Sequence, residues 1–353
     1  MSVSPKEKIF FAEHLSLMIK GGIPISEALE TLKNGAESKE LKKALDDILK
    51  RVLEGERLEK SFARHPRIFD KFFRSVIRVG ESSGTLEENL RYLSLQIRKD
   101  YELKGKIMGA LLYPFLVIAL AVVIILGVTF FVIPKIVPLF QALQQMGVAG
   151  ELPFATKFLI FLSSFLKKFW YVIIGGFFIL IFIFKILQRI KFIRFYFDNI
   201  KLSLPIIGQI SKNINLARFS QSLYTLLKSG MPILEALETC RSILPNEIYK
   251  RNLIDVIAGV ERGEKISSSL KKIPKNFPPI FAEMILVGEK TGSLEDSLFY
   301  LSRFYEREVD TSLKNISSII GPILLIFIGV FIILIALSTI IPIYEFIGEI
   351  RVR

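Results

Sequence analysis

Charged and apolar segments alternate along the chain of 353 residues. Residues 110–133 and 319–341 contain no charged side chain, and a third apolar segment, 169–187, has only Lys185 near its end. A helix of about 20 apolar residues crosses the hydrocarbon core of a bilayer. The pattern therefore predicts three transmembrane helices, at 110–133, 169–187 and 319–341.

The charged segments show the periodicity of amphipathic helices. Between Lys39 and Leu53, for example, Leu41, Leu45 and Leu49 recur at a spacing of four and share one face. A similar pattern begins at Leu86 and continues into the first apolar segment. We therefore expect one long helix to lead from the charged segment into the bilayer.

The chain also repeats itself at a constant offset of 208 residues, so that Gly22 corresponds to Gly230 without a gap. The register extends into the apolar segments, where Pro114 corresponds to Pro322. Chance does not keep one offset through so many Gly, Pro and Glu positions, and such self-similarity indicates a duplicated structural unit. The expected fold class is an all-α membrane protein with two homologous cytoplasmic helical bundles and three transmembrane helices.

Two homologous units are expected on the same side of the membrane, so the chain must cross back between them. The segment 169–187 supplies that crossing, and the larger Lys and Arg clusters flanking the two units place both of them in the cytoplasm. The N-terminus is then cytoplasmic and the C-terminus external. The predicted order is a first cytoplasmic bundle (1–109), a transmembrane helix (110–133), a periplasmic or external loop (134–168), a second transmembrane helix (169–187), a second cytoplasmic bundle (188–318), a third transmembrane helix (319–341) and an external C-terminal tail (342–353).

Two short motifs occur in both copies. Each contains residues that suit a turn between helices, because glycine adopts positive φ and proline is tolerated at the start of a helix. The turn motif comprises Gly22, Pro24 and Glu27 in the first copy and Gly230, Pro232 and Glu235 in the second. The acidic motif comprises Gly80, Glu81, Gly84 and Glu87 in the first copy and Gly288, Glu289, Gly292 and Glu295 in the second.

Glu81 and Glu289 have two possible roles. They either support the fold, by capping a helix N-terminus or by pairing within the domain, or they form an acidic surface that binds a partner or a cation. The sequence alone leaves both alternatives open.

Pro114 and Pro322 lie about one turn inside their apolar segments. A proline inside a helix removes a backbone hydrogen bond, so we expect a kink at each position. The bend either has no further role or frees a carbonyl that a neighbouring helix satisfies.

Composition and charge exclude several classes of function. The net charge is +13, yet no basic run or nucleic-acid motif occurs, so the excess fits a membrane protein with cytoplasmic Lys and Arg rather than direct nucleic-acid binding. The single cysteine, Cys240, cannot form an internal disulfide, and neither His14 nor His65 has ligand partners at metal-binding spacing. No phosphate-binding Walker motif occurs. We therefore expect no enzymatic activity, no metal and no cofactor.

The two repeated motifs, together with three spans in this order, resemble the type II secretion F / type IV pilus assembly C family of inner-membrane platform proteins. The resemblance covers nearly the whole chain, from about Phe10 to Ile343. It implies that a cytoplasmic hexameric assembly ATPase supplies work, which the platform transmits to pilin or pseudopilin subunits in the bilayer.

This resemblance also implies a set of partners. They are the ATPase, the transmembrane helices of pilins or pseudopilins, other inner-membrane assembly components, membrane lipid, and further copies of the chain in a homodimer or higher homo-oligomer. If Glu81 or Glu289 binds a partner, reversing its charge should stop filament assembly and leave the protein folded. The alternative function is a small-molecule transporter or channel subunit, which would need a polar path that the three spans of one chain do not show.

Overall fold

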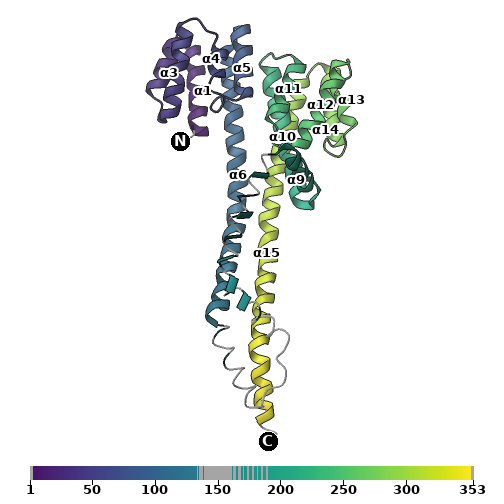
Figure 1. Ribbon diagram of the computed structural model, residues 1–353. Helices are drawn as coiled ribbons and strands as arrows, with labels where there is room; N and C mark the ends of the chain where they lie inside the picture. Colours follow the sequence, from purple (N-terminus) through teal and green to yellow (C-terminus); the bar gives the residue numbers. More distant parts are fainter. Residues whose placement is uncertain are drawn as a thin grey trace. The chain divides into compact units, whose positions relative to one another are not determined.

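The computed structural model describes residues 3–132 and 190–350, with isolated positions between 134 and 187 (Figure 1). In these residues every regular element is helical, which confirms the predicted all-α class for the described part of the chain. The predicted loop 134–168 and second span 169–187 lie outside the continuously described residues. So do the last three positions of the predicted tail 342–353.

The chain divides into two compact units. The first, which we name the paired-copy unit, comprises Met1–Ile107 and Lys191–Ser312. The second, which we name the apolar unit, comprises Met108–Ile190 and Leu313–Arg353. Most of the two predicted bundles thus lies in one unit, and the predicted spans 110–133 and 319–341 lie in the other.

The helices of the two copies correspond one to one. The first copy contains α1 (Pro5–Lys20), α2 (Ile25–Asn34), α3 (Lys39–Leu53), α4 (Leu58–Ala63), α5 (Lys71–Ser83) and the start of α6 (Leu86–Gly127). The second contains α9 (Lys191–Ser203), α10 (Pro205–Lys228), α11 (Ile233–Ile243), α12 (Glu247–Glu261), α13 (Ile266–Lys271), α14 (Pro279–Thr291) and the start of α15 (Leu294–Ile350). Helices α4 and α13, and α5 and α14, keep the offset of 208 at both ends. Helix α9 precedes the repeated part.

Helix ends in the first copy follow from local chemistry. Ser4 and Glu7 form a capping box at the start of α1, and Ser38 and Asp70 accept backbone N–H groups at the starts of α3 and α5. Gly84 ends α5 in the left-handed conformation. These caps set the corners between short helices that are too short to be stable alone.

Each copy encloses an aromatic core. In the first copy, Phe62 packs edge-on against Phe69, with ring centroids 4.5 Å apart. The second copy has Leu270 in place of Phe62, but it also has Tyr249 in place of Leu41, and the Tyr249 ring packs against Phe277 at 5.4 Å. At these two pairs of positions each copy thus has one aromatic ring, but at a different position in the core.

Helices α6 and α15 are the longest described elements. Helix α6 has 42 residues and α15 has 57, so their lengths are about 63 Å and 85 Å at 1.5 Å per residue. Each is continuous through its proline, Pro114 or Pro322, and α6 is followed by a π-helical turn, Val128–Val132. The expected single helix leading out of the first copy is confirmed, whereas the kinks stay a prediction.

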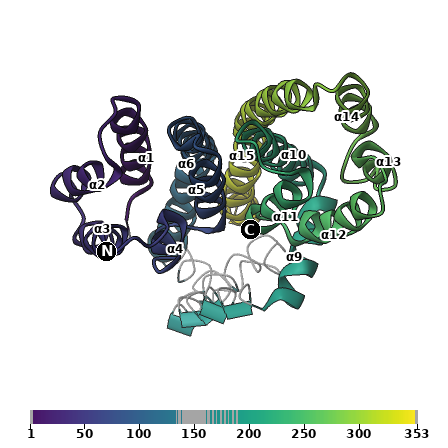
Figure 2. The same cartoon turned by 90° about the horizontal axis from the view of Figure 1, so that it is seen from above.

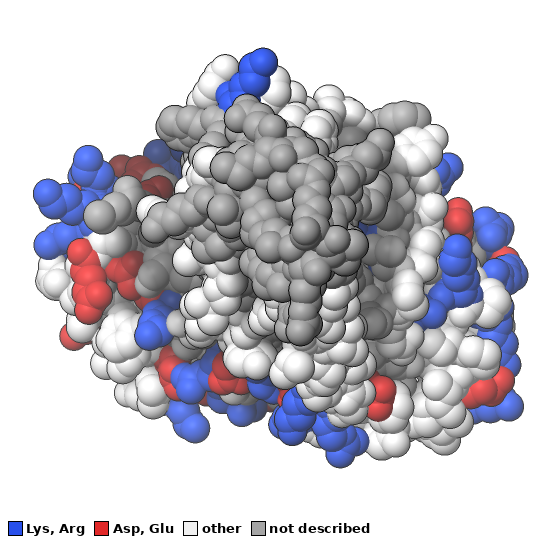
Figure 3. Space-filling view, turned by 90° about the horizontal axis from the view of Figure 1, so that it is seen from below, with Lys and Arg blue, Asp and Glu red and all other residues white. Residues whose placement is uncertain are grey.

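Much of the apolar surface of these helices is exposed. Phe115 in α6 keeps 68% of its surface accessible, and Leu325 in α15 keeps 74%. Among the described residues, one helix, Leu86–Ile124, is long and apolar enough to cross a membrane, and the apolar stretch Gly321–Ile333 is shorter. In the space-filling view from below, Lys, Arg, Asp and Glu side chains gather towards the sides, whereas much of the remaining described surface is white (Figure 3).

Candidate functional site

The turn motif has the same backbone geometry in both copies. Gly22 and Gly230 adopt φ values of 78° and 81°, which favour glycine, and each ends its helix. Pro24 and Pro232 then occupy the N-cap positions of α2 and α11. The motif therefore fixes the corner between the first two helices of each copy.

The acidic residue of the turn motif differs between the copies. Glu235 forms an ion pair with Arg78, which lies on α5 of the first copy. Glu27 is exposed, and its backbone carbonyl accepts a hydrogen bond from the Thr31 hydroxyl at 3.0 Å. Only the second copy thus uses this position to contact the other copy.

The glycines of the acidic motif have two separate functions. Gly84 and Gly292 take the left-handed conformation, with φ of 73° and 69°, and end α5 and α14 as the sequence predicts. Gly80 and Gly288 are instead helical, and a Cβ atom there would approach the backbone of α6 or α15 at 2.9 or 2.8 Å. They allow two successive helices to cross in close contact, a role that the sequence analysis did not assign.

Glu81 and Glu289 cap the short helices α4 and α13. Glu81 accepts hydrogen bonds from the first two N–H groups of α4 at 2.8 and 3.2 Å. Glu289 accepts the equivalent bonds of α13 at 2.6 and 3.3 Å, and also the Ser267 hydroxyl at 2.5 Å. The side chains at the N-caps themselves, Arg57 and Lys265, make no capping bond. A carboxylate at a helix N-terminus stabilises both the unpaired N–H groups and the helix dipole.

Glu87 and Glu295 continue the motif into the next helix. The backbone carbonyl of Glu87 accepts a hydrogen bond from the Ser16 hydroxyl on α1 at 2.9 Å. The carboxylate of Glu295 lies 3.6 Å from the ammonium of Lys228 on α10. In each copy the acidic motif therefore joins the α5–α6 or α14–α15 corner to the short capped helix and to the first helix of the repeat.

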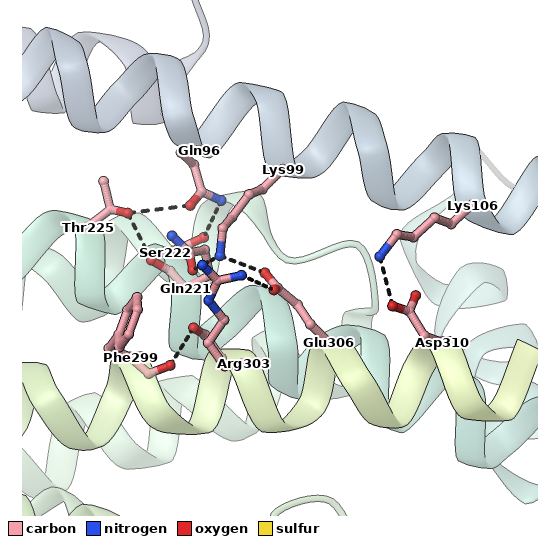
Figure 4. Close-up of polar contacts among 11 residues, drawn as sticks. Gln96, Lys99, Lys106, Gln221, Ser222, Thr225, Phe299, Arg303, Glu306 and Asp310 are labelled. Atoms are coloured by element: carbon pink, nitrogen blue, oxygen red, sulfur yellow. Dashed lines mark hydrogen bonds and ion pairs between the residues drawn. The ribbon is translucent and has the colours of Figure 1, made fainter.

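A second polar cluster joins the two copies, at a surface that we name the copy interface. It consists of α5 and the start of α6 from the first copy, facing α10 and α11 from the second (Figure 2). The amide of Gln96 donates to the Ser222 hydroxyl at 3.3 Å and accepts from the Thr225 hydroxyl at 3.4 Å (Figure 4). These three side chains are 3% exposed or less. Because buried polar groups need their partners, this network fixes one register between the copies.

Charged groups border the same interface. The ammonium of Lys99 donates to Gln221 at 3.0 Å and to Glu306 on α15 at 2.8 Å (Figure 4). Asp100 lies 3.3 Å from the guanidinium of Arg218 on α10. Burial raises the pKa of the Asp100 carboxyl, and the nearby Arg218 charge opposes that rise. A second ion pair, between Lys106 and Asp310, joins α6 to α15 at 2.8 Å.

Among the residues named here at the copy interface, only Glu235 belongs to a motif that the sequence repeats. A signal was nevertheless present, because alignment of the copies places Arg218, Ser222 and Thr225 opposite Phe10, His14 and Leu17. At two of these pairs, Phe10/Arg218 and Leu17/Thr225, the side chain is apolar in one copy and polar in the other, so the position does not belong to the shared core. Such positions are candidates for a surface with a different neighbour in each copy.

Within the described residues, no three His, Cys, Asp or Glu side chains are grouped so that they could hold a metal ion. Cys240 is fully buried, and burial raises the pKa of its thiol, which disfavours the nucleophilic thiolate. What the arrangement can do is hold helices in register and present surfaces. The described residues thus define a class of duplicated, helical proteins that combine a polar pair of bundles with long helices carrying exposed apolar side chains.

Comparison with known proteins agrees with this class. The family model described as type II secretion system (T2SS), protein F matches residues 11–134 and again 219–342, the same offset of 208. The chain is 31% identical to the type IV pilus assembly protein PilC of Thermus thermophilus, over 99% of this chain and 84% of that relative. It is 29% identical to PilC of Pseudomonas aeruginosa, over 97% of this chain and 90% of that relative.

A further relative is the type II secretion system protein F of Vibrio cholerae, 29% identical over 97% of this chain and 83% of that protein. The chain therefore belongs to the type II secretion system protein F family, as its repeated motifs predict.

Proposed function

We propose that this chain is the inner-membrane platform protein of a type IV pilus or type II secretion machine. It would couple a cytoplasmic assembly ATPase to the insertion of pilin or pseudopilin subunits into the filament. The observation that carries this proposal is the family match in both copies, together with relatives named as pilus assembly or secretion proteins that align with 97–99% of this chain.

The geometry supports a mechanical role. Each copy ends in one continuous helix, α6 or α15, that runs from the paired-copy unit into the apolar unit. A continuous helix keeps its backbone hydrogen bonds from turn to turn, so a displacement at its polar end is passed along its length. The polar contacts at Lys99 and Lys106 tie these two helices together within the paired-copy unit. In this proposal the ATPase acts on the paired copies, and pilin transmembrane helices contact the apolar helices.

The proposal includes three membrane crossings, with both copies and the N-terminus in the cytoplasm and the C-terminus in the periplasm. Exposed apolar side chains on α6 and α15 support two of the crossings, and the uncharged length of 169–187, apart from Lys185, supports the third. Alkaline phosphatase, which is active only outside the cytoplasm, should be active when fused after position 150 and inactive when fused after position 230. Activity at both sites would contradict this topology.

We also propose that Glu81 and Glu289 act in the fold rather than as a docking surface. Their carboxylates are already engaged by the backbone N–H groups of α4 and α13. Charge reversal would place a cation against the positive end of a helix dipole, so we now expect these variants to be unstable. This replaces the expectation of a folded but inactive protein.

One experiment tests the proposed function directly. A strain that lacks this chain should form no filaments or secrete no pseudopilin-dependent substrate, and the intact chain should restore the activity. The purified chain in detergent should also retain the assembly ATPase of the same organism. Normal filament assembly and secretion without the chain, combined with solute flux through liposomes containing it, would instead support the transporter alternative.

A further inference from the structure

The duplication leaves one face of the second copy covered and the equivalent face of the first copy open. On α10, Ser222 and Thr225 are 1% and 2% exposed because they contact α6 of the first copy. Leu17 on α1, the equivalent of Thr225, is 59% exposed. Phe10, the equivalent of Arg218, is 52% exposed. We name the surface formed by Phe10, Glu13, His14 and Leu17 the α1 face.

The opposite relation holds on the other side of the copy interface. On α5 and α6 of the first copy, Val79 and Tyr92 are each 8% exposed. Their equivalents on α14 and α15, Val287 and Tyr300, are each 50% exposed. We name the surface formed by Val287, Tyr300, Phe304 and Arg307 the α15 face.

Each chain therefore contains one closed copy interface and the two separate halves of a second one. The α1 face is the open equivalent of the surface on α10, and the α15 face is the open equivalent of the surface on α5 and α6. We propose that the α1 face of one chain binds the α15 face of a second chain, in the same arrangement that joins the two copies within a chain. This rests on the homo-oligomer that the family resemblance implies for the proposed platform, and it names the surfaces that would form it.

The chemistry of the two open faces is complementary. Where the copy interface places Gln96 against Ser222 and Thr225, the equivalent residues are Phe304 against His14 and Leu17. An aromatic and apolar centre is typical of contacts between separate chains, because its burial supplies the free energy of association.

At the edge of the proposed contact between chains, the basic residue lies on α15, as it lies on the equivalent helix α6 within the chain. Lys99 donates to Gln221 within the chain, and the equivalent pair between chains is Arg307 with Glu13. Arg307 is exposed, and Glu13 keeps 44% of its side-chain surface accessible while it pairs with Arg98. An arginine and a carboxylate in place of a lysine and an amide would strengthen this edge contact.

A contact between different faces is heterologous. Repetition of such a contact gives a ring if the rotation closes and an open series if it does not. It does not give an isologous dimer, in which both chains use the same surface patch. This difference supplies a direct test.

The test uses two tagged forms of the full chain, co-expressed and purified in detergent, with Cys240→Ala in both. One form carries Glu13→Cys and the other carries Arg307→Cys, and a short bis-maleimide reagent links thiols that lie close together. We expect linked dimers from the mixture and none from either form alone. Linking in the Glu13→Cys form alone, or no linking in the mixture, would overturn the proposal.

Two controls keep this result interpretable. Arg78→Cys with Glu235→Cys in a single chain should link internally, because these residues pair across the copy interface. Leu17→Asp and Tyr300→Asp should each abolish the linking between chains and lower the native mass. The matched control is Leu53→Glu, which replaces a similarly exposed leucine whose equivalent in the second copy is Glu261, and it should change neither measurement.

The experiment needs neither ATPase nor pilin, so its outcome is separate from that of the proposed function. A chain that restores filaments but does not link through these faces would reject this inference alone. A chain that links as expected but does not restore filaments would reject the platform function alone.

Discussion

The two copies of the repeat agree at the acidic motif and differ on the first helix. Glu81 and Glu289 cap α4 and α13 with nearly the same pair of backbone hydrogen bonds. Helices α1 and α10 are also equivalent, yet Leu17 is exposed where Thr225 is buried. The capping glutamates, which each copy needs in order to fold, are therefore the same in both copies. Residues on the surface of the first helix differ according to the neighbour that each copy contacts.

The largest expected effect is at the glycines that let helices cross. Gly80→Ala and Gly288→Ala would push a Cβ atom to within 2.9 Å and 2.8 Å of the next helix backbone. We expect each to lower the free energy of unfolding by roughly 2–3 kcal/mol, as overpacking does. Thermal or denaturant unfolding of the full chain in detergent measures this.

The control for that change is Gly105→Ala on α6, where nothing lies within 4 Å of the added Cβ. Because alanine has the higher helix propensity, this variant should be more stable by up to about 1 kcal/mol. Equal stability of Gly80→Ala and the natural protein would show that the close crossing is not needed.

A smaller effect is expected at the caps. Glu81→Ala and Glu289→Ala each leave two N–H groups without an acceptor and should lower the free energy of unfolding by about 1–2 kcal/mol. In the second copy, Cys240 is fully buried and reacts with a thiol reagent only after local opening. Its thiol should therefore react faster in the Glu289→Ala variant. Glu30→Ala, at an exposed position on α2, should change neither measurement. If Cys240 of the Glu289→Ala variant reacted with the thiol reagent at an unchanged rate, the Glu289 cap would not stabilise the second copy.

The positions at which the two cores carry their aromatic ring, Leu41/Tyr249 and Phe62/Leu270, predict that changes in stability at these sites are not additive. Phe62→Leu should cost the first copy about 1 kcal/mol, because it leaves space beside Phe69. Adding Leu41→Tyr copies the second copy, in which the Tyr249 hydroxyl donates to the backbone carbonyl of Asn276 at 2.8 Å. The double variant should be more stable than the sum of the two single changes predicts. Strict additivity would show that the exchanges are independent.

The smallest expected effect concerns pH. Hydrogen bonds from Lys272 and then Arg262 lower the pKa of Glu264 from its ordinary value of 4.5 to about 2. A lowered carboxyl pKa stabilises the fold above the unfolded value and loses that contribution as pH falls from about 4.5 towards 2. Glu264→Gln should therefore flatten the acid side of the melting-temperature profile slightly. A profile identical to that of the natural protein would show that these surface bonds contribute nothing measurable.

Much of this fold follows from the sequence because the repeat supplies its own comparison. The offset of 208, the long helix after Leu86 and the left-handed glycines Gly84 and Gly292 all depend on local or periodic signals. The hydrogen bonds of Glu81 were not predictable in detail, since its partners on α4 lie 22 and 23 residues away in the chain. The contact of Gln96 with Ser222, 126 residues apart, depends on tertiary packing that no local pattern encodes.

The most direct test of the account measures filament assembly or secretion in a strain whose own copy of the chain is replaced. We expect Leu17→Asp, on the open α1 face, to abolish assembly while the protein stays folded and membrane-inserted. We expect Leu53→Glu, a change at a similarly exposed leucine away from both faces, to leave assembly intact. Normal assembly with Leu17→Asp would contradict the claim that the exposed half of the duplicated interface is part of how this protein works.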